Sequence, residues 1–327
     1  MFNICMIGHG MMGRWHSETL KTVADCRLHT LVGRRPEPTA AFAREFDYEH
    51  WSTDLTSVLA DPAIDLVVVA NPSEAHAATA IAVLESGRHT LCEIPIGMDL
   101  AQAEAVVKAA EASRCKLALV YPMRMMPDMV ALHHRVRAGE ERIRLIESRF
   151  IIKRWENVGA TGYRRSWTDN LLWHHLGHLV DFAFWLTGTA AVSVWSHLPA
   201  PDSRTGTPMD ALVGVGTDAD QTFAFLGSYA GHQPVCDTLI LTDRECYRLD
   251  SIRDTLVTAA GVKQLAPEQV DCAAALLDFL DAVRTDREPA ITGRSVLPMM
   301  GVLQAAQNCW DTRHGVMAIP GRGASPG

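Results

Sequence analysis

The sequence lacks features that would place the chain in several broad classes of protein. No apolar run approaches the roughly 20 residues that a membrane-spanning helix needs. Lys and Arg form no basic stripe, and the net charge is -8, so nucleic acid is not expected as a partner. The chain starts on a strand pattern rather than on a signal peptide, which favours a cytoplasmic protein with no membrane partner.

Paired cysteine motifs and internal repeats are also missing. The eight cysteines are scattered without a C-x-x-C spacing, and most lie in apolar surroundings. We therefore expect buried, reduced thiols and no metal site. With 327 residues, 48% of them hydrophobic and 21% charged, the chain has room for two globular domains.

A glycine-rich segment follows the first apolar run, Phe2 to Ile7, and precedes a helical pattern that extends to about Ala24. It reads Gly8-His9-Gly10-Met11-Met12-Gly13. A G-x-G-x-x-G segment between a strand and a helix is the fingerprint of dinucleotide binding. Its glycines permit a tight turn, close approach of the pyrophosphate, and close packing of helix on strand. The alternative is a glycine-rich turn with no ligand.

The next predicted strand, Arg27 to Val32, ends in Gly33-Arg34-Arg35. A site for NAD usually has Asp or Glu at this position, where it binds the ribose hydroxyls. Two guanidinium groups can instead pair with the 2′-phosphate of NADP. The sequence therefore favours NADP as cofactor, with NAD possible; the alternative is that both arginines lie in a solvated loop.

Strands and helices continue to alternate as far as about Tyr121, which predicts a doubly wound parallel sheet over residues 1–121. Because cofactors lie at the carboxyl ends of such strands, residues that follow the strands 66–70 and 89–92 become candidate cofactor contacts. They are Asn71, Pro72, His76, Glu93 and Pro95. His76 is equally well explained as a hydrogen-bonded helix residue.

From residue 142 the pattern changes to longer strands separated by turns, which is typical of an antiparallel sheet. We expect an α+β domain over residues 122–320, opening with a helix at 127–138, and a loose tail at 321–327. The predicted strands are 143–152, 192–198, 211–217, 222–229, 238–242 and 246–250. Late helices are predicted at 269–285 and 297–312, and the second is a candidate to pack back on the first domain.

One predicted helix of this second domain is rich in imidazoles. It starts at about Asn170, with Thr168 or Asp169 as its cap, and places an apolar stripe on one side. The stripe consists of Leu172, Leu176, Leu179, Ala183 and Leu186. The opposite face carries His174, His178, Asp181 and Trp185, with His175 about a quarter turn away. A face of imidazoles indicates a cleft suited to proton transfer; the alternative is a surface helix with chance histidines.

These segments together resemble the Gfo/Idh/MocA oxidoreductase family along essentially the whole chain. Its E-K-P motif corresponds to Glu93-Ile94-Pro95, and its D-x-x-x-H motif to His174-x-x-x-His178. One branch of the family has both changes. That resemblance implies an NADP-dependent enzyme of aromatic compound catabolism, which oxidises the cyclic hemiacetal of 4-carboxy-2-hydroxymuconate semialdehyde to a pyrone dicarboxylate.

The resemblance also implies roles for individual residues. The family lysine polarises the reacting oxygen, and Ile94 cannot do so. A hemiacetal hydroxyl is more acidic than that of a simple alcohol, so His178 can act as general base, with His174 orienting the substrate. Candidates for binding the carboxylated substrate are Arg124, Lys153, Arg154, Arg165, Trp167 and His175. For the cations, the alternative is surface ion pairing.

Two other functions remain open at this point. The chain can be a sugar or cyclitol dehydrogenase of the same family, or a protein that binds NADP without catalysis. An exposed face of the second sheet predicts a homodimer or homotetramer.

Overall fold

The computed structural model describes residues 1–159, 162, 164–168, 170–266, 272–312 and 317–318. The chain forms two compact units, each built from three stretches. Unit 1 contains residues 1–125, 156–169 and 271–297, and unit 2 contains residues 126–155, 170–270 and 298–327. The predicted tail 321–327 and residues 269–271 lie outside the described residues.

Unit 1 is built around a parallel sheet of six strands in the order β3-β2-β1-β4-β5-β6. The strands are β1 (Phe2–Ile7), β2 (Cys26–Val32), β3 (His50–Ser52), β4 (Leu66–Val69), β5 (His89–Cys92) and β6 (Leu117–Leu119). All four side chains of β4 are buried, as its unbroken apolar run predicts for a strand covered on both faces. The predicted doubly wound sheet is confirmed.

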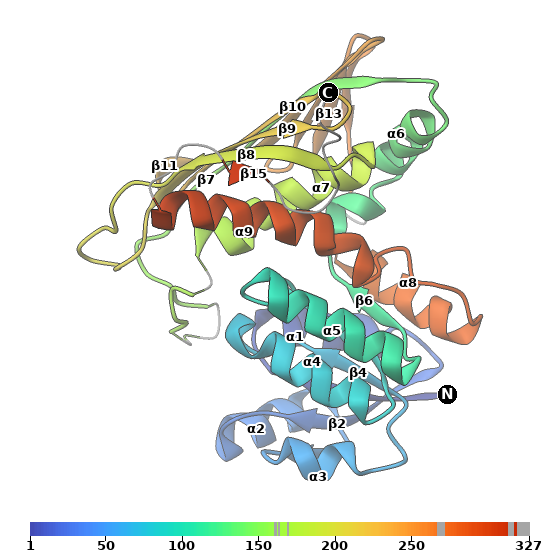
Figure 1. The fold of residues 1–327 in the computed structure, drawn as a ribbon. Coiled ribbons are helices and arrows are strands. Elements are labelled where there is room, and N and C mark those ends of the chain that lie inside the picture. Colours follow the sequence, from blue (N-terminus) through green and yellow to red (C-terminus); the bar gives the residue numbers. More distant parts are fainter. Residues whose placement is uncertain (160–161, 163, 169, 267–271, 313–316, 319–327) are drawn as a thin grey trace. The chain divides into compact units, whose positions relative to one another are not determined.

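Helices connect these strands, and Figure 1 shows α4 and α5 side by side along the sheet. They are α1 (Met11–Lys21), α2 (Pro36–Phe46), α3 (Leu55–Leu59), α4 (His76–Glu85) and α5 (Leu100–Ser113), with 3₁₀ turns η1 (Ser73–Ala75) and η2 (Pro122–Met125). Their ends follow local rules. Asp54 and Asp99 cap α3 and α5 by accepting hydrogen bonds from first-turn amides.

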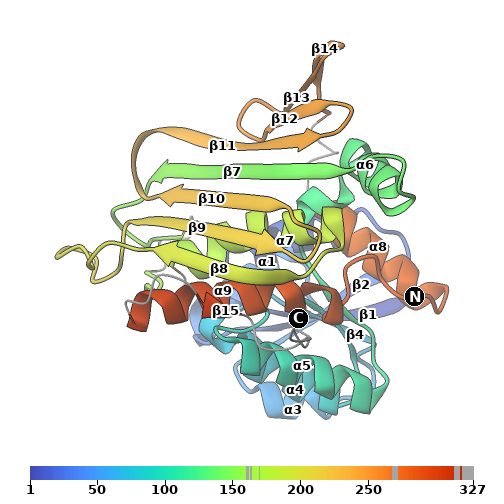
Figure 2. The same ribbon diagram turned by 45° about the horizontal axis from the view of Figure 1, so that its top comes forward.

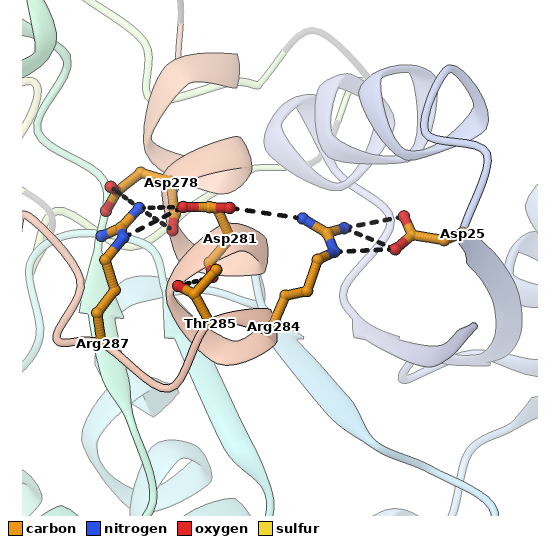
Figure 3. A network of polar contacts seen from close by, with 6 residues as sticks. All are labelled: Asp25, Asp278, Asp281, Arg284, Thr285 and Arg287. Atoms are coloured by element: carbon orange, nitrogen blue, oxygen red, sulfur yellow. Dashed lines mark hydrogen bonds and ion pairs between the residues drawn. The ribbon is translucent and has the colours of Figure 1, made fainter.

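A late helix, α8 (Ala273–Arg284), completes unit 1 and packs against β5 and β6. Figure 3 shows its surface network: Arg284 Nη2 lies 2.7 Å from Asp25 Oδ2 and holds the pKa of that carboxyl below its usual value. Arg287 contacts Asp278 and Asp281. The other late helix, α9 (Leu297–Thr312), groups with unit 2 from Pro298 onward. Our expectation that it packs back on the first domain stays a prediction.

Unit 2 is built around a nine-stranded sheet, ordered β14-β13-β12-β11-β7-β10-β9-β8-β15 (Figure 2). All its strand pairs are antiparallel except β7–β10. The strands are β7 (Ile143–Lys153), β8 (Ala191–His197), β9 (Asp210–Thr217), β10 (Thr222–Ser228), β11 (Ala230–Thr242), β12 (Cys246–Asp250), β13 (Thr255–Thr258), β14 (Gly261–Gln264) and β15 (Met317–Ala318). The predicted mostly antiparallel sheet is confirmed.

Helices α7 (Gly177–Thr187) and α9 cover one face of this sheet, and α6 (Pro127–Arg137) packs beside α7. The predicted apolar stripe of the histidine helix is confirmed, since all five of its side chains are buried. Outward-facing apolar side chains, including Trp195, Leu226 and Leu241, remain exposed. Among the described residues, every helix is too short or too polar to cross a lipid bilayer.

Candidate active site

The glycine loop of unit 1 has the geometry of a phosphate-binding turn. Gly8 has a φ of +107°, and a Cβ there would lie 2.3 Å from the carbonyl oxygen of Ala70. At Gly13 a Cβ would lie 2.2 Å from the oxygen of Gly8. A Cβ at Gly10, in contrast, would meet nothing within 4 Å. The first and third glycines are therefore needed for packing, and the second leaves open space for a ligand.

That open space lies at the start of α1, where Gly10 is the N-cap. Gly10 offers no capping side chain, and the first turn, from Met11 and Met12 to Gly13, contains no acidic residue. The first amides of a helix carry partial positive charge, so this end suits a pyrophosphate. The residues present thus fit a dinucleotide.

The tip of β2 contacts the same loop through His9. The His9 ring packs against Gly33, where a Cβ would lie 2.8 Å from it, and approaches Thr39 Oγ1 at 3.3 Å. Burial lowers the pKa of His9, and the neighbouring Arg35 lowers it further. Arg34 and Arg35 are both exposed at this tip. A neutral His9 beside exposed cations is compatible with an anionic adenosine phosphate.

His76 joins the carboxyl ends of β4 and β5. Its Nε2 lies 2.7 Å from the carbonyl oxygen of Asn71, and its Nδ1 lies 2.8 Å from that of Pro95. The side chain is almost fully buried. These contacts support a role in holding the two loops together. Asn71 and Pro72 themselves stay predicted cofactor contacts.

Glu93 has a buried partner, His16, that was not predicted from the sequence. Its Oε1 lies 2.6 Å from Nε2 of His16, which α1 places one helical turn beyond the glycine loop. Both side chains are buried, and so is Ile94 at the position of the family lysine. The loop after β5 therefore offers a carboxylate that is already paired and an apolar side chain.

Arg124, a predicted substrate contact, lies inside unit 1. Its guanidinium donates to Ser295 Oγ at 2.9 Å and to the Ser295 carbonyl oxygen at 3.1 Å, and it stands over the ring of Tyr121. Only 4% of the residue is exposed. These contacts support a structural role, and its role toward the substrate stays a prediction.

The segment that leads to the histidine helix also belongs to unit 1. The Arg165 amide donates to the Asn157 carbonyl oxygen at 2.7 Å, while Arg165 and Trp167 are partly buried. Ser166 and Thr168 place their hydroxyls near Glu74. The roles of Arg165 and Trp167 toward a substrate stay predictions.

The histidine helix opens with a π-helical turn, η3 (Leu171–Leu176), before α7. Its cap is Asn170, whose Oδ1 accepts from the amides of Leu172 and Trp173, so the prediction of Thr168 is wrong. The alternative, Asp169, lies outside the described residues. The reason is position: Asn170 immediately precedes the first turn, whereas the Thr168 hydroxyl is engaged elsewhere. Single π-turns are costly and occur often at functional sites.

Three imidazoles cluster on this turn and the start of α7. The ring centroid of His174 lies 4.3 Å from that of His175 and 5.9 Å from that of His178, both edge-on. All three side chains are partly buried rather than solvent-facing. The prediction of two imidazoles one turn apart is confirmed as geometry, and their catalytic roles stay predictions.

Tyr229 organises the surroundings of His175 and was not predicted from the sequence. Its hydroxyl lies 2.7 Å from His175 Nδ1, and Arg154 Nη1 donates to it at 3.3 Å. The residue is fully buried, the Arg154 guanidinium stands 5.3 Å from its ring centroid, and Phe150 stacks on His175. Tyr229 thus holds a predicted substrate-binding cation and an imidazole in one arrangement.

Other predicted residues of unit 2 differ in how far they are exposed. Lys153 is exposed at the end of β7. Asp181, predicted on the histidine face, is buried. Trp185 stacks on His133 of α6 with ring centroids 4.5 Å apart, so it packs between helices rather than lining a cleft.

Comparisons with known proteins give matches to both parts of the chain. Residues 2–121 match the model of an oxidoreductase family with an NAD-binding Rossmann fold, Gfo/Idh/MocA. Residues 127–263 match the C-terminal domain of bacterial oxidoreductases.

Similar proteins extend these matches. The chain is 34% identical over 182 residues to 4-carboxy-2-hydroxymuconate-6-semialdehyde dehydrogenase of Sphingobium sp. (strain NBRC 103272 / SYK-6), covering 55% of this chain and 58% of that enzyme. It is 25% identical over 230 residues to inositol 2-dehydrogenase of Rhizobium meliloti (strain 1021), covering 70% of this chain and 66% of that enzyme. The matched part thus spans less than two thirds of either relative.

A solved structure supports the fold over nearly the whole chain. Levoglucosan dehydrogenase, in complex with NADH and levoglucosan, superposes with a TM-score of 0.86 over 98% of this chain and 100% of that one. Its 17% sequence identity shows the shared fold alone. Because the two family matches together cover residues 2–121 and 127–263, the chain belongs to the Gfo/Idh/MocA oxidoreductases.

Proposed function

We propose that the protein is an NADP-dependent dehydrogenase of a carboxylated cyclic hemiacetal or hydroxy acid. The observation that carries this proposal is the histidine cluster with its partly buried cation, Arg154. His174, His175 and His178 lie together, and Tyr229 links His175 to Arg154. The similarity to 4-carboxy-2-hydroxymuconate-6-semialdehyde dehydrogenase supports the substrate class.

In the proposed reaction, bound NADP⁺ supplies the nicotinamide carbon that accepts hydride from the substrate. His178 accepts the proton of the substrate hydroxyl, so that the C–O bond becomes a carbonyl as the C–H bond breaks. His174 donates a hydrogen bond to the developing oxyanion. General-base assistance of this kind is typically worth about 10² to 10⁴ in rate.

The buried Ile94 fits a substrate that needs little help with deprotonation. An isoleucine can neither hold nor polarise an oxygen. The hydroxyl of a hemiacetal is more acidic than that of a simple alcohol, and oxidation of the proposed substrate would yield a stable conjugated lactone. We therefore assign the task of the family lysine to the imidazoles.

Arg154 is proposed to bind the substrate carboxylate. An arginine can form two parallel hydrogen bonds to a carboxylate, and its fork loses less freedom when neighbours already orient it. Tyr229 supplies this orientation through its hydroxyl and ring. Lys153, next in the chain and exposed, can add charge.

A second candidate function is oxidation of a sugar or cyclitol, favoured by the similarity to inositol 2-dehydrogenase. The purified protein mixed with NADP⁺ and either carboxylated ring-cleavage aldehydes or polyols, followed by absorbance of the reduced cofactor, separates the two. Turnover of the carboxylated compounds supports our proposal, and turnover of polyols alone supports the second. Cofactor binding without turnover of either set would indicate a non-catalytic NADP-binding protein.

The cofactor preference has its own test in Arg34 and Arg35. Each replaced singly by Ala should weaken NADP binding at least about tenfold, because a charge-assisted pair with the 2′-phosphate is lost, and should change NAD binding little. Calorimetric titration with both nucleotides measures this. Arg44→Ala, an equal charge change at the other end of α2, is the control. Equal losses for NAD and NADP would refute selection by these arginines.

A further inference from the structure

A second cluster of imidazole and carboxylate lies in unit 1, on the edge of the parallel sheet. Within the described part of the chain, His29, Glu49 and His50 each offer one ligand atom, and these atoms lie within 4.8 Å of one another. We propose that this group binds a divalent transition-metal ion of the zinc type, in a site separate from the histidine cluster of unit 2.

The parallel pairing of β2 and β3 brings the three residues together. Thr30 of β2 pairs with His50 of β3, and the Glu49 amide donates to the Leu28 carbonyl oxygen at 3.2 Å. His29 therefore has both partner residues beside it on the neighbouring chain segment. Hydrogen-bonded backbone fixes the positions from which all three side chains start.

The donor set suits zinc better than magnesium or calcium. Two imidazole nitrogens and one carboxylate oxygen match ions such as Zn²⁺, Ni²⁺ or Co²⁺, whereas Mg²⁺ and Ca²⁺ prefer oxygen alone. Three protein ligands leave the fourth tetrahedral position for water. With bonds of about 2.0–2.2 Å, ligand atoms in such a site lie roughly 3.4 Å apart, so the side chains would have to close by at most about 1.4 Å.

The surroundings allow this closure. His29 is buried, and its Nδ1 lies 2.9 Å from Thr30 Oγ1, an outer contact that orients the ring and leaves Nε2 as the binding atom. Its ring centroid is 5.0 Å from that of His50, with the planes inclined at 69° rather than stacked. Glu49 and His50 are exposed, so they can rotate toward an ion that enters from solvent.

Glu49 already has a cationic partner, Arg27, at 3.2 Å. Both side chains are about two fifths exposed, and Arg27 also donates to Asn3 through Nε. Surface pairs of this kind are weak, so a dication bound by two further ligands can displace the guanidinium. The ion would then link the edge strand β3 to β2. These two strands pair over only three residues.

The test uses the full-length protein freed of metal and titrated with ZnCl₂ by calorimetry, with CoCl₂ absorption as a report of coordination. We expect one ion per chain at this site, a visible Co²⁺ spectrum of four-coordinate type, and a higher melting temperature with Zn²⁺. His50→Ala and Glu49→Gln should each lower the affinity at least tenfold and abolish that melting shift. Both positions are exposed, so the fold should survive.

His197→Ala provides the matched control, because His197 is an exposed strand histidine of unit 2. It should bind Zn²⁺ as the unaltered protein does. Equal affinity of the unaltered protein and His50→Ala would overturn the proposal, and so would failure of the unaltered protein to bind a stoichiometric ion. No substrate or nucleotide is used, so the result is independent of the proposed dehydrogenase activity.

Discussion

Replacing His178 with Asn should lower turnover at least about a hundredfold while NADP still binds. The substitution keeps a polar side chain and removes the nitrogen that we propose accepts the hydroxyl proton, so a general-base contribution would be lost. Because the glycine loop belongs to the other unit, the nucleotide affinity should change little. Steady-state kinetics and nucleotide titration of the same preparation measure both effects.

His174→Asn should give a smaller loss, since His174 is assigned to orienting the substrate and stabilising charge. Its effect should appear partly in KM, whereas that of His178→Asn should appear in kcat. His197→Asn, at an exposed position on the separate strand β8, controls for the loss of an imidazole as such. Near-normal turnover of His178→Asn would remove His178 from the chemistry.

Gly10→Val should weaken NADP binding by roughly a hundredfold, about 2.7 kcal/mol, with little loss of thermal stability. A side chain at Gly10 would meet no protein atom within 4 Å of its Cβ, so it would occupy the space that we expect the pyrophosphate to approach. A poorer N-cap should cost no more than about 1 kcal/mol. Calorimetric titration and thermal melting separate the two effects.

Gly8→Ala is the matched variant and should behave in the opposite way. Its Cβ would lie 2.3 Å from a backbone oxygen, and the positive φ disfavours any side chain. We expect a marked fall in melting temperature from strain of at least about 1–3 kcal/mol. Full affinity of Gly10→Val for NADP would exclude the loop as a pyrophosphate site.

Segments whose pattern is local could be predicted from the sequence with near-final bounds. The apolar run Phe2–Ile7 before a glycine turn, the strand His89–Cys92 and the helix Leu297–Thr312 all match the structure. In each case an apolar run or an amphipathic spacing is visible within a few consecutive residues of the sequence. The glycine loop was predictable for the same reason, since its function depends on consecutive backbone positions.

Exposed strands were harder to predict. The hairpin of β13 and β14 was missed because its side chains are mixed or exposed, as at Val262, and alternate weakly. β11 starts at Ala230, eight residues before the predicted Thr238, since His232-Gln233-Pro234 resembles a turn. Sheet neighbours, rather than local pattern, hold these residues extended.

Contacts between distant residues could not be predicted at all. The His16–Glu93 pair and the Tyr229 bonds to His175 and Arg154 each join different elements. A residue such as Tyr229, at the end of an apolar strand, gives no local sign of its partners. The parallel pairing of β7 and β10 brings the carboxyl ends of both strands to the same edge of the sheet, and no local pattern predicts this pairing.

The wide turn at Leu171–Leu176 has a consequence for how this chain tolerates insertions and deletions. A π-turn accommodates one residue more than an α-helical turn of the same length. Deleting a single residue there would restore regular winding, but it would also rotate everything upstream by about 100° relative to α7. Such a deletion could keep all three histidines and still move His175 away from the Tyr229 hydroxyl, while His178 keeps its position on α7.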